Sequence, residues 1–257
     1  MRKYQKAARV CLTIFSALSG LFGEDYHDVK NLTDGLLQGY SRSIIPKRNQ
    51  SETIKLEMDF SLKALNKFNV VDGHMTVVTA IALKWKDELL SWDSQTNKNI
   101  SELNLPLGRI WSPNLYLLNC AEQFLIYKGD PDTKEVEFSS NGEARLFFME
   151  VFTTTCTSDI AFYPNDIHHC NIYLSTLTSA SKLRMGSAKV DTLDFETNGE
   201  WNLGNTKSEH EDVTVTSKLS SSRNQKSLRS RLSASGIIPI SLIYRNRLSN
   251  IPLPQTK

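Results

Sequence analysis

The sequence predicts an all-β protein, a β-sandwich with one α-helix near its N terminus. Apolar and polar residues alternate over several short stretches, which is the pattern of half-buried strands. Turn signals such as Asp72-Gly73 and Asp130-Pro131-Asp132 separate these stretches. Many short strands, turns between them and a single early helix are together typical of a β-sandwich.

The predicted helix runs from Asp28 to about Tyr40. Its apolar residues recur at the spacing of one helix face: Val29, Leu32, Leu36, Leu37 and Tyr40. Pro46 and the polar residues after it end the segment, because proline cannot continue a helix.

The first predicted strand covers residues 54–62, where apolar side chains alternate with charged or polar ones. After the Asp72-Gly73 turn, a second strand is predicted from Met75 to Trp85. Later apolar stretches predict three more strands: Ala144–Phe152, Asn171–Leu177 and Gly236–Arg247. A basic, serine-rich segment at residues 217–235 precedes the last strand and is typical of a mobile hairpin tip.

The composition fits a folded domain and argues against nucleic-acid binding. Of the 257 residues, 40% are hydrophobic, which is enough for a sizeable core. The formal charge of +2 includes residues 1–23, which hold four basic residues and no acidic one. Without them, 26 basic and 28 acidic residues leave a net charge of −2.

Residues 1–23 have the pattern of a secretory signal peptide, which predicts a secreted, extracellular protein. A basic start precedes an apolar run, Val10–Phe22, that is too short to span a bilayer. Three sequons for N-glycosylation support secretion, at Asn31, Asn49 and Asn99. No run of about 18 apolar residues follows, which predicts either a soluble protein or the ectodomain of a longer receptor. Residues 248–257 are predicted to be a flexible tail.

Cys156 and Cys170 bound a short segment that combines Pro164 with the apolar residues Ile160, Phe162 and Tyr163. It resembles the signature loop of the Cys-loop receptor family, the pentameric neurotransmitter-gated channels and their soluble relatives, the acetylcholine-binding proteins. The matching positions are Cys156, Ile160, Tyr163, Pro164, Asp166 and Cys170, whereas Ser158 replaces the usual apolar residue.

Other stretches resemble the same family over roughly residues 28–247. The first is Trp85-Lys-Asp87-Glu-Leu-Leu90-Ser-Trp92, whose tryptophans are expected to pack in the core or at a corner of the sandwich. Trp111-Ser-Pro113-Asn114 is similar to a W-x-P-D motif, with Asn114 in place of aspartate. Asn198-Gly199-Glu200-Trp201 follows further along the chain.

The resemblance implies an immunoglobulin-like sandwich of about ten strands, in one domain over residues 24–247. It also implies a disulfide between Cys156 and Cys170, stabilising by about 3 kcal/mol, and homo-oligomers, most simply pentamers. Cys11 leaves with the signal peptide, so Cys120 is left over. An odd cysteine in a secreted protein predicts either a buried thiol or a disulfide between chains.

Family members that bind acetylcholine hold its quaternary ammonium in an aromatic box through cation–π attraction. The corresponding positions here are aliphatic: Ala80, Leu118 and Leu177. Residues 204–235, where the family usually carries two adjacent cysteines and tyrosines, contain no cysteine and no aromatic residue. We therefore expect small-molecule amines to bind poorly. Amino-acid binding through Arg145 and Arg184 is another alternative, without a specific pattern beside them.

The leading hypothesis from the sequence is a secreted, oligomeric binding protein for calcium or amorphous calcium carbonate that regulates mineralisation, as in one molluscan branch of soluble relatives. Calcium takes six to eight oxygen ligands, and these acidic residues are the candidates: Asp130, Asp132, Glu135, Glu137, Asp191, Asp194, Glu196, Glu209, Glu211 and Asp212. None of these runs has the spacing of a dedicated calcium loop, so solvated acidic loops are the simpler interpretation.

The alternative hypothesis is a soluble acetylcholine-binding protein or the extracellular ligand-binding domain of a pentameric channel subunit. An enzyme is not expected, because the sequence contains no H-E-x-x-H motif, nucleophile elbow or phosphate loop. His168 and His169 have no second ligand pair nearby in the sequence, so no metal or other cofactor is predicted beyond calcium.

Overall fold

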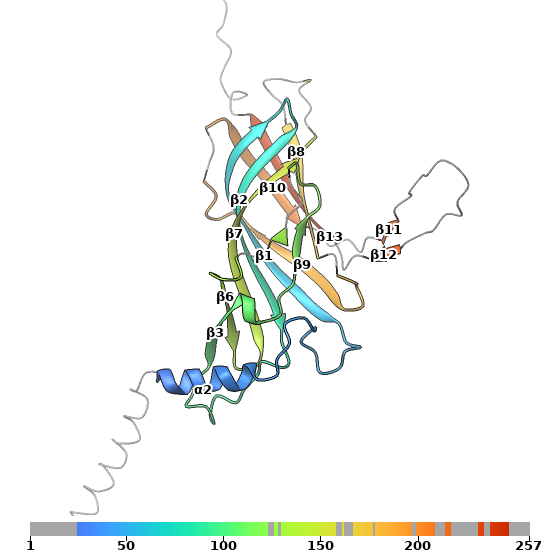
Figure 1. Cartoon of the computed structure of the whole chain (residues 1–257). Coiled ribbons are helices and arrows are strands. Elements are labelled where there is room, and N and C mark those ends of the chain that lie inside the picture. The colour runs from blue at the N-terminus through green and yellow to red at the C-terminus, as the bar shows by residue number, and fades with distance from the viewer. Residues whose placement is uncertain are drawn as a thin grey trace, which may run out of the picture.

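Two packed β-sheets form the body of the molecule, and one helix lies across one end of them (Figure 1). The computed structural model describes residues 25–122, 126–127, 130–157, 161, 167–176, 178–196, 199–208, 214–216, 231–233 and 237–246. The predicted signal peptide and the predicted tail at residues 248–257 lie outside the described residues. The prediction of an all-β sandwich with one N-terminal helix is confirmed.

The larger sheet has six strands in the order β3-β6-β7-β2-β1-β9. Strands β1 and β9 run parallel to each other, and the other neighbours are antiparallel. A short 3-10 helix, η1 (Leu107–Arg109), follows β3. In chain order, the strands of this sheet are β1 (Ile54–Asn69), β2 (His74–Lys86), β3 (Glu102–Pro106), β6 (Glu135–Ser139), β7 (Glu143–Thr155) and β9 (Leu183–Asp191).

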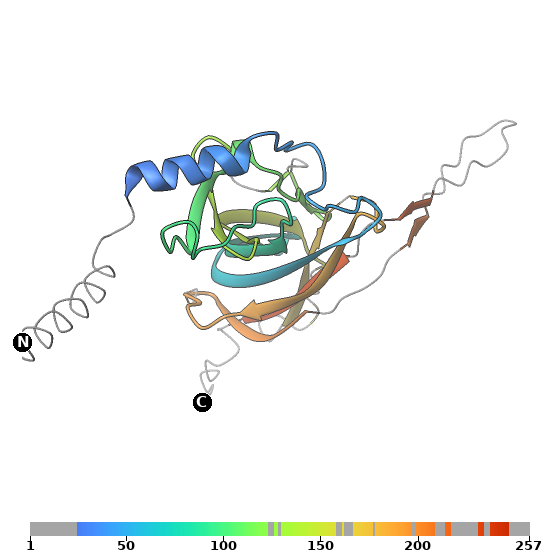
Figure 2. The ribbon, with the colours of Figure 1, turned by 90° about the horizontal axis from the view of Figure 1, so that it is seen from below.

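The smaller sheet has five antiparallel strands in the order β10-β13-β8-β4-β5. Its strands are β4 (Leu115–Leu117), β5 (Ile126–Tyr127), β8 (Ile167–Ser175), β10 (Trp201–Ser208) and β13 (Ile237–Asn246). The short strands β11 (Thr214–Thr216) and β12 (Arg231–Ser233) pair only with each other and form a separate ribbon, drawn away from the sandwich in Figures 1 and 2.

The core lies between the two sheets and follows from the alternation seen in the sequence. Along the first half of β1, buried apolar side chains alternate with exposed or half-buried ones. Each fully buried large apolar side chain contributes about 1.5–3 kcal/mol relative to an exposed one. The largest side chains buried in this core are Tyr244, Phe60, Phe138, Phe148, Phe152, Ile54, Leu56, Met58, Leu62, Met75, Ile81 and Leu83.

The helix α2 (Tyr26–Leu37) begins after Asp25, whose side chain accepts a hydrogen bond from the His27 N–H. Leu36 and Leu37 pack against the core, so the helix covers one end of the sandwich (Figure 2). The prediction that it continues to Tyr40 is wrong. Gly39 adopts a φ of +76°, a left-handed conformation that ends helices, and the chain has already left the helix by then.

Strand β1 is seven residues longer than predicted, because the sequence pattern loses its period of two after Leu62. The pairing of β1 with β2 shifts between Leu62 and Ala64 and again between Leu65 and Lys67. Each bulge turns the following side chains to the other face. The strand continues to Asn69, but its alternation cannot be followed in the sequence.

Buried Asp87 holds together the end of β2, the segment after α2 and the turn before β7. Its carboxylate accepts hydrogen bonds from the Tyr40 hydroxyl at 2.7 Å and from the Leu89 and Leu90 N–H groups at 2.9 and 3.1 Å. The Asp87 N–H donates to the Gly142 carbonyl at 2.9 Å. Gly142 has a φ of +85°, and a Cβ there would overlap the Asp87 carbonyl oxygen, so only glycine fits.

The two tryptophans of the same motif pack as predicted. Trp85 is buried and contacts Trp111 edge-to-face, with ring centroids 6.0 Å apart. Trp92 is half-buried, and its indole N–H donates to the Ile100 carbonyl at 2.7 Å. The W-x-D-x-x-L-x-W stretch is therefore a structural corner at the helix end of the sandwich.

Candidate functional site

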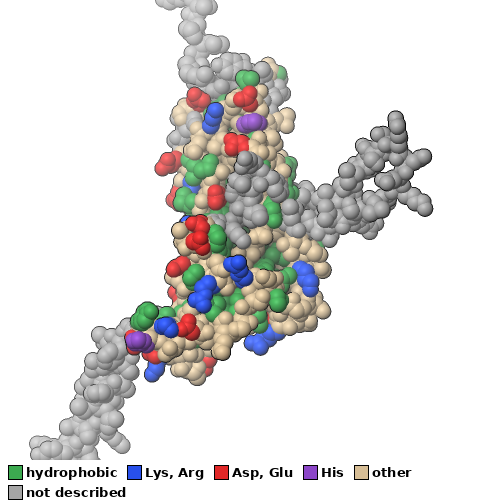
Figure 3. Space-filling model, in the orientation of Figure 1, with side chains coloured by type: hydrophobic (Ala, Val, Ile, Leu, Met, Phe, Trp, Pro, Cys, Tyr) green, Lys and Arg blue, Asp and Glu red, His purple; other side chains and the backbone are tan. Residues whose placement is uncertain are grey.

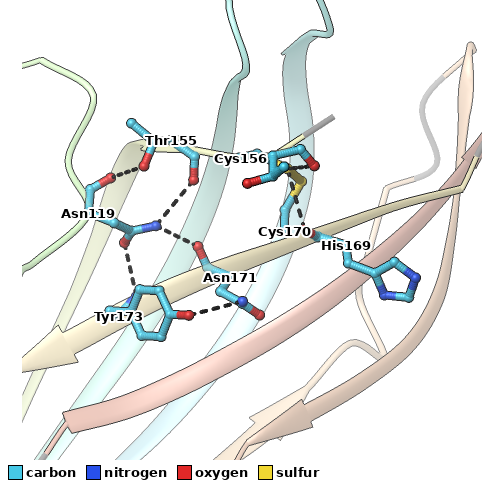
Figure 4. The surroundings of a disulfide bond; sticks show 8 residues. Asn119, Thr155, Cys156, His169, Cys170, Asn171 and Tyr173 are labelled. Carbon is cyan, nitrogen blue, oxygen red and sulfur yellow. Dashed lines mark hydrogen bonds between the residues drawn. A yellow bond between two sulfur atoms is a disulfide. The ribbon is translucent and has the colours of Figure 1, made fainter. Parts of the chain in front are cut away.

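The disulfide between Cys156 and Cys170 joins the two sheets (Figure 4). Cys156 directly follows β7 of the six-stranded sheet, and Cys170 lies within β8 of the five-stranded sheet. Both cysteines are buried. The predicted bond is present. Much of the loop that it closes, residues 158–160 and 162–166, lies outside the described part of the chain.

The hairpin turn between β1 and β2 packs directly against this disulfide. The Cys156 N–H donates to the Gly73 carbonyl at 2.7 Å. Gly73 has a φ of +65°, and a Cβ there would lie 2.9 Å from the Cys156 carbonyl oxygen. The side chain of Asn69 closes the turn by accepting hydrogen bonds from the Val71 and Asp72 N–H groups. The predicted Asp72-Gly73 hairpin turn is confirmed.

Asn119 places its side-chain amide between the two strands that the disulfide connects (Figure 4). Its Nδ2 donates to the Asn171 carbonyl at 2.8 Å and to the Thr155 carbonyl at 3.3 Å. Its Oδ1 accepts from the Tyr173 N–H at 3.1 Å. Thr155 precedes Cys156 and Asn171 follows Cys170, so the amide and the disulfide bridge the same two strands side by side.

The two predicted ligand-box positions that the structure describes, Ala80 and Leu118, fall on different sheets. Leu118 follows β4 in the five-stranded sheet, and its N–H donates to the Tyr173 carbonyl of neighbouring β8 at 2.8 Å. Ala80 lies in β2 of the six-stranded sheet, opposite Met149 of β7. Leu177, after β8, lies outside the described residues. Leu118 thus adjoins a strand of the five-stranded sheet, whereas Ala80 belongs to the six-stranded sheet.

An apolar stripe runs along the outer face of the six-stranded sheet around Ala80. We define it by three opposed residue pairs of β2 and β7: Val78 with Val151, Ala80 with Met149 and Ala82 with Phe147. The three β7 side chains are half exposed, at 52% for Phe147, 54% for Met149 and 50% for Val151. Ala80 and Ala82 are covered, with 4% and 6% exposed.

Sequence reasoning missed this stripe, although a signal was present. Residues 146–149 read Leu-Phe-Phe-Met, which breaks the alternation expected of a strand with one face in water. Leu146 and Phe148 enter the core. Phe147 and Met149 alternate with them and point to the outer face. Patches of apolar side chains lie among charged ones along the body of the molecule (Figure 3).

A row of charged side chains borders the stripe toward the helix end. Lys84 of β2 lies opposite Arg145 of β7 and forms an ion pair with Asp59 at 2.6 Å. Arg145 is 3.8 Å from Glu137 of β6. A groove of about 500 Å³ opens between these strands. Exposed ion pairs of this kind contribute about 0–1 kcal/mol each, so they supply polarity around the stripe more than stability.

A family model of the neurotransmitter-gated ion-channel ligand binding domain matches residues 29–227, which is most of the chain. The chain belongs to this family. The resemblance drawn from the sequence is thereby confirmed at the level of the family, without support for the calcium carbonate-binding branch.

Relatives of this ligand-binding domain include neuronal acetylcholine receptor subunit beta-3 from Gallus gallus, 29% identical over 177 residues, and from Rattus norvegicus, 28% identical over 203 residues. Neuronal acetylcholine receptor subunit alpha-4 from Gallus gallus is 25% identical over 196 residues. These alignments cover 67%, 77% and 75% of this chain and 38%, 42% and 31% of the relatives. The chain therefore spans less than half the length of these relatives.

The acidic residues predicted to contact calcium are dispersed over the described part of the ligand-binding domain. Asp130 is occupied in its own turn, where it accepts hydrogen bonds from the Asp132 N–H and the Thr133 hydroxyl. Asp191 accepts from the Leu193 N–H, and Asp194 pairs with Lys63 at 2.7 Å. Glu135 and Glu137 lie two residues apart on exposed positions of β6, and Glu196 bridges to β1 through its backbone.

Within the described residues, no three His, Cys, Asp or Glu side chains lie close enough together to hold a metal ion. The last predicted calcium contacts, Glu209, Glu211 and Asp212, lie outside the described part. Calcium binding stays a prediction from the sequence that the described geometry does not favour.

Arg145 and Arg184 are not brought together in this domain. They lie on β7 and β9, with β2 and β1 between them. Neighbouring strands are about 4.8 Å apart, so the two arginine backbones are separated by roughly 14 Å. The fold therefore does not favour a site in which both guanidinium groups hold the same amino-acid ligand.

The predicted roles of Cys120 and of the three sequon asparagines stay predictions, and the structure shows how exposed these residues are. Cys120 is half-buried, lies outside the disulfide and forms an isolated β-bridge with Thr154. The three sequon asparagines, Asn31, Asn49 and Asn99, are all exposed, so their glycosylation is sterically open and stays a prediction. Within the described ranges, no helix is both long and apolar enough to cross a membrane.

Proposed function

We propose that this chain acts as an extracellular ligand-binding domain that assembles into oligomers, most simply pentamers, and has no enzymatic activity of its own. Membership of the neurotransmitter-gated ion-channel ligand binding domain family supports the proposal. So do the relatives, which by their names are receptor subunits. The proposal therefore follows the alternative stated from the sequence and sets aside calcium carbonate as the ligand.

The observation that carries the proposal is the apolar stripe. Three large apolar side chains of β7 stand half exposed in one patch, beside the charged row of Lys84 and Arg145. Contiguous apolar patches with a polar rim are typical of protein–protein contacts, because water-exposed apolar area favours burial. A second copy of this chain is the occupant that fits best, since the relatives are subunits of larger receptors by name.

The proposed ligand is a molecule that can bind between aliphatic side chains, without aromatic rings around it. Ala80 lies in the middle of the stripe, so the predicted ligand position and the proposed contact surface between copies coincide. Ala80 and Leu118 offer no ring face to a cation, and each missing cation–π contact lowers the affinity for a quaternary amine by about 0.5–2 kcal/mol. We therefore propose that the ligand is not a choline-like amine.

Assembly is tested by placing charge on the stripe. The double variant Phe147→Glu and Met149→Glu is expected to convert oligomers into monomers, because it buries two unpaired charges at the contact. Light scattering of the purified secreted protein gives the mass. Leu193→Glu is the matched control, since Leu193 is 91% exposed and lies outside the stripe. An unchanged mass in the stripe variant, or the same dissociation in the control, would contradict the proposed surface.

The ligand class is tested by restoring rings. The natural protein is expected to show no micromolar binding of acetylcholine in calorimetry. The double variant Ala80→Trp and Leu118→Tyr is expected to gain affinity by about 2- to 30-fold per ring that contacts the cation. Ala80→Leu with Leu118→Met changes side-chain size without adding rings and is the control. Micromolar binding by the natural protein would overturn the proposed loss of amine recognition.

A further inference from the structure

The segment from Leu115 to Ala121 changes from one sheet to the other at Asn119. Before it, β4 pairs with β8, and the Leu118 N–H donates to the Tyr173 carbonyl of β8 at 2.8 Å. After it, Cys120 bridges to Thr154 of β7, and the Ala121 N–H donates to the Thr153 carbonyl at 2.9 Å. The chain thus leaves the five-stranded sheet and joins the edge of β7 within three residues.

Asn119 itself bonds to both sheets. Its backbone carbonyl accepts from the Thr155 N–H of β7 at 3.0 Å. Its amide group donates to the Thr155 and Asn171 carbonyls and accepts from the Tyr173 N–H. One side chain therefore satisfies two carbonyls and one N–H between β7 and β8, beside the disulfide (Figure 4).

Only a short amide supplies this combination of groups. An asparagine has two N–H donors and one carbonyl acceptor, whereas an aspartate has acceptors only and a serine hydroxyl has a single donor. The disulfide joins the two strands through their side chains, at the sulfur atoms. The Asn119 amide ties the backbones themselves, one residue away from each cysteine.

We infer that Asn119 is a positioning residue that couples the segment of Leu118 to the ends of β7 and β8 that the disulfide joins. A displacement of Leu118 moves Asn119, and Asn119 moves the ends of both strands that enter the loop. The coupling follows from bonds within one chain, so it holds whether or not the domain assembles as proposed and whatever ligand it takes.

The inference is tested by hydrogen exchange of single amides in two variants. Asn119→Ala is expected to speed exchange of the Tyr173 and Cys156 amides by at least about fivefold, the loss expected for one or more hydrogen bonds. Asn119→Asp keeps an acceptor for Tyr173 but loses both donated bonds. It is therefore expected to speed exchange at Cys156 while Tyr173 stays protected.

The Asp87 amide, which donates to Gly142 at the helix end, serves as the internal control for general loss of stability. Equal acceleration at Asp87, Cys156 and Tyr173 would reduce Asn119 to an ordinary stabilising residue and overturn the inference. Unchanged exchange at Cys156 in both variants would overturn it as well.

Coupling to Leu118 is tested by combining variants. Leu118→Ala is expected to speed exchange at Cys156 in the natural background and to add at most a small further increase on Asn119→Ala, because the connecting amide is already gone. If Leu118→Ala accelerates Cys156 exchange by the same factor in both backgrounds, the two positions act independently and the coupling does not pass through Asn119.

Discussion

Removing the disulfide, with the double variant Cys156→Ala and Cys170→Ala, is expected to lower the free energy of unfolding by about 3 kcal/mol. The bond spans a sequence separation of 14 residues, and its loss restores that loop's freedom to the unfolded chain. Alanine avoids placing hydroxyl groups in the buried sites of the two cysteines. Chemical denaturation, followed by fluorescence of the buried tryptophans, measures the loss.

Cys120→Ala is the matched control, because Cys120 is only half-buried and lies outside the bond. It is expected to cost less than about 1 kcal/mol. Reducing agent should lower the stability of this control as much as it lowers that of the natural protein. A double alanine variant within about 1 kcal/mol of the natural protein would show that the disulfide contributes little to this fold.

Asp87→Ala is expected to lower the free energy of unfolding by about 3–5 kcal/mol, which rivals the loss of the disulfide. The substitution leaves the Tyr40 hydroxyl and the Leu89 and Leu90 N–H groups without their acceptor in a site closed to water. Asp87→Asn is expected to cost much less, because its carbonyl still accepts from the two N–H groups and its amide faces the Tyr40 oxygen. Similar losses for both variants would contradict the assigned hydrogen bonds.

The same residue makes stability depend on pH. Burial raises the pKa of Asp87 above its ordinary value of 3.8, and the hydrogen bonds from Tyr40, Leu89 and Leu90 offset this only in part. The folded state therefore binds the proton more tightly than the unfolded state does. Stability from this group is present at pH values below 3.8 and is lost as the pH rises through the folded pKa. Asp87→Asn should lack this pH dependence. The check is the free energy of unfolding of the natural protein and of the variant, measured by denaturation at several pH values.

The sequence predicts those parts of the fold whose cause is local. Alternation places Ile54 to Leu62 in a strand, Asp72-Gly73 in a hairpin turn and the leucines of α2 on one helix face. The end of α2 and the second half of β1 could not be placed in this way. The helix ends at Leu37, three residues before the apolar pattern does, and two bulges interrupt the alternation of β1 after Leu62.

The site was less predictable because its parts meet only in the folded chain. Nothing in the local sequence distinguishes Asn119 from other polar residues. Its partners, the carbonyls of Thr155 and Asn171, come from β7 and β8, which lie much later in the chain. The hydrogen-bonded site around Asp87 includes Tyr40, which lies 47 residues earlier in the chain. Phe147 and Met149 look like core residues in the sequence, since a strand covered on both faces also shows a continuous apolar run. Whether the second cover comes from this chain or from another copy is not encoded in the local pattern.

The oxidation rate of Met149 in the intact protein tests the proposed assembly most directly. Met149 is 54% exposed in the single chain, whereas Met75 and Met185 are buried in the core. If another copy covers the stripe, dilute hydrogen peroxide should convert Met149 to its sulfoxide nearly as slowly as Met75 and Met185, as read by mass spectrometry of peptides. Oxidation of Met149 as rapid as that of a methionine in an unfolded peptide would contradict the account.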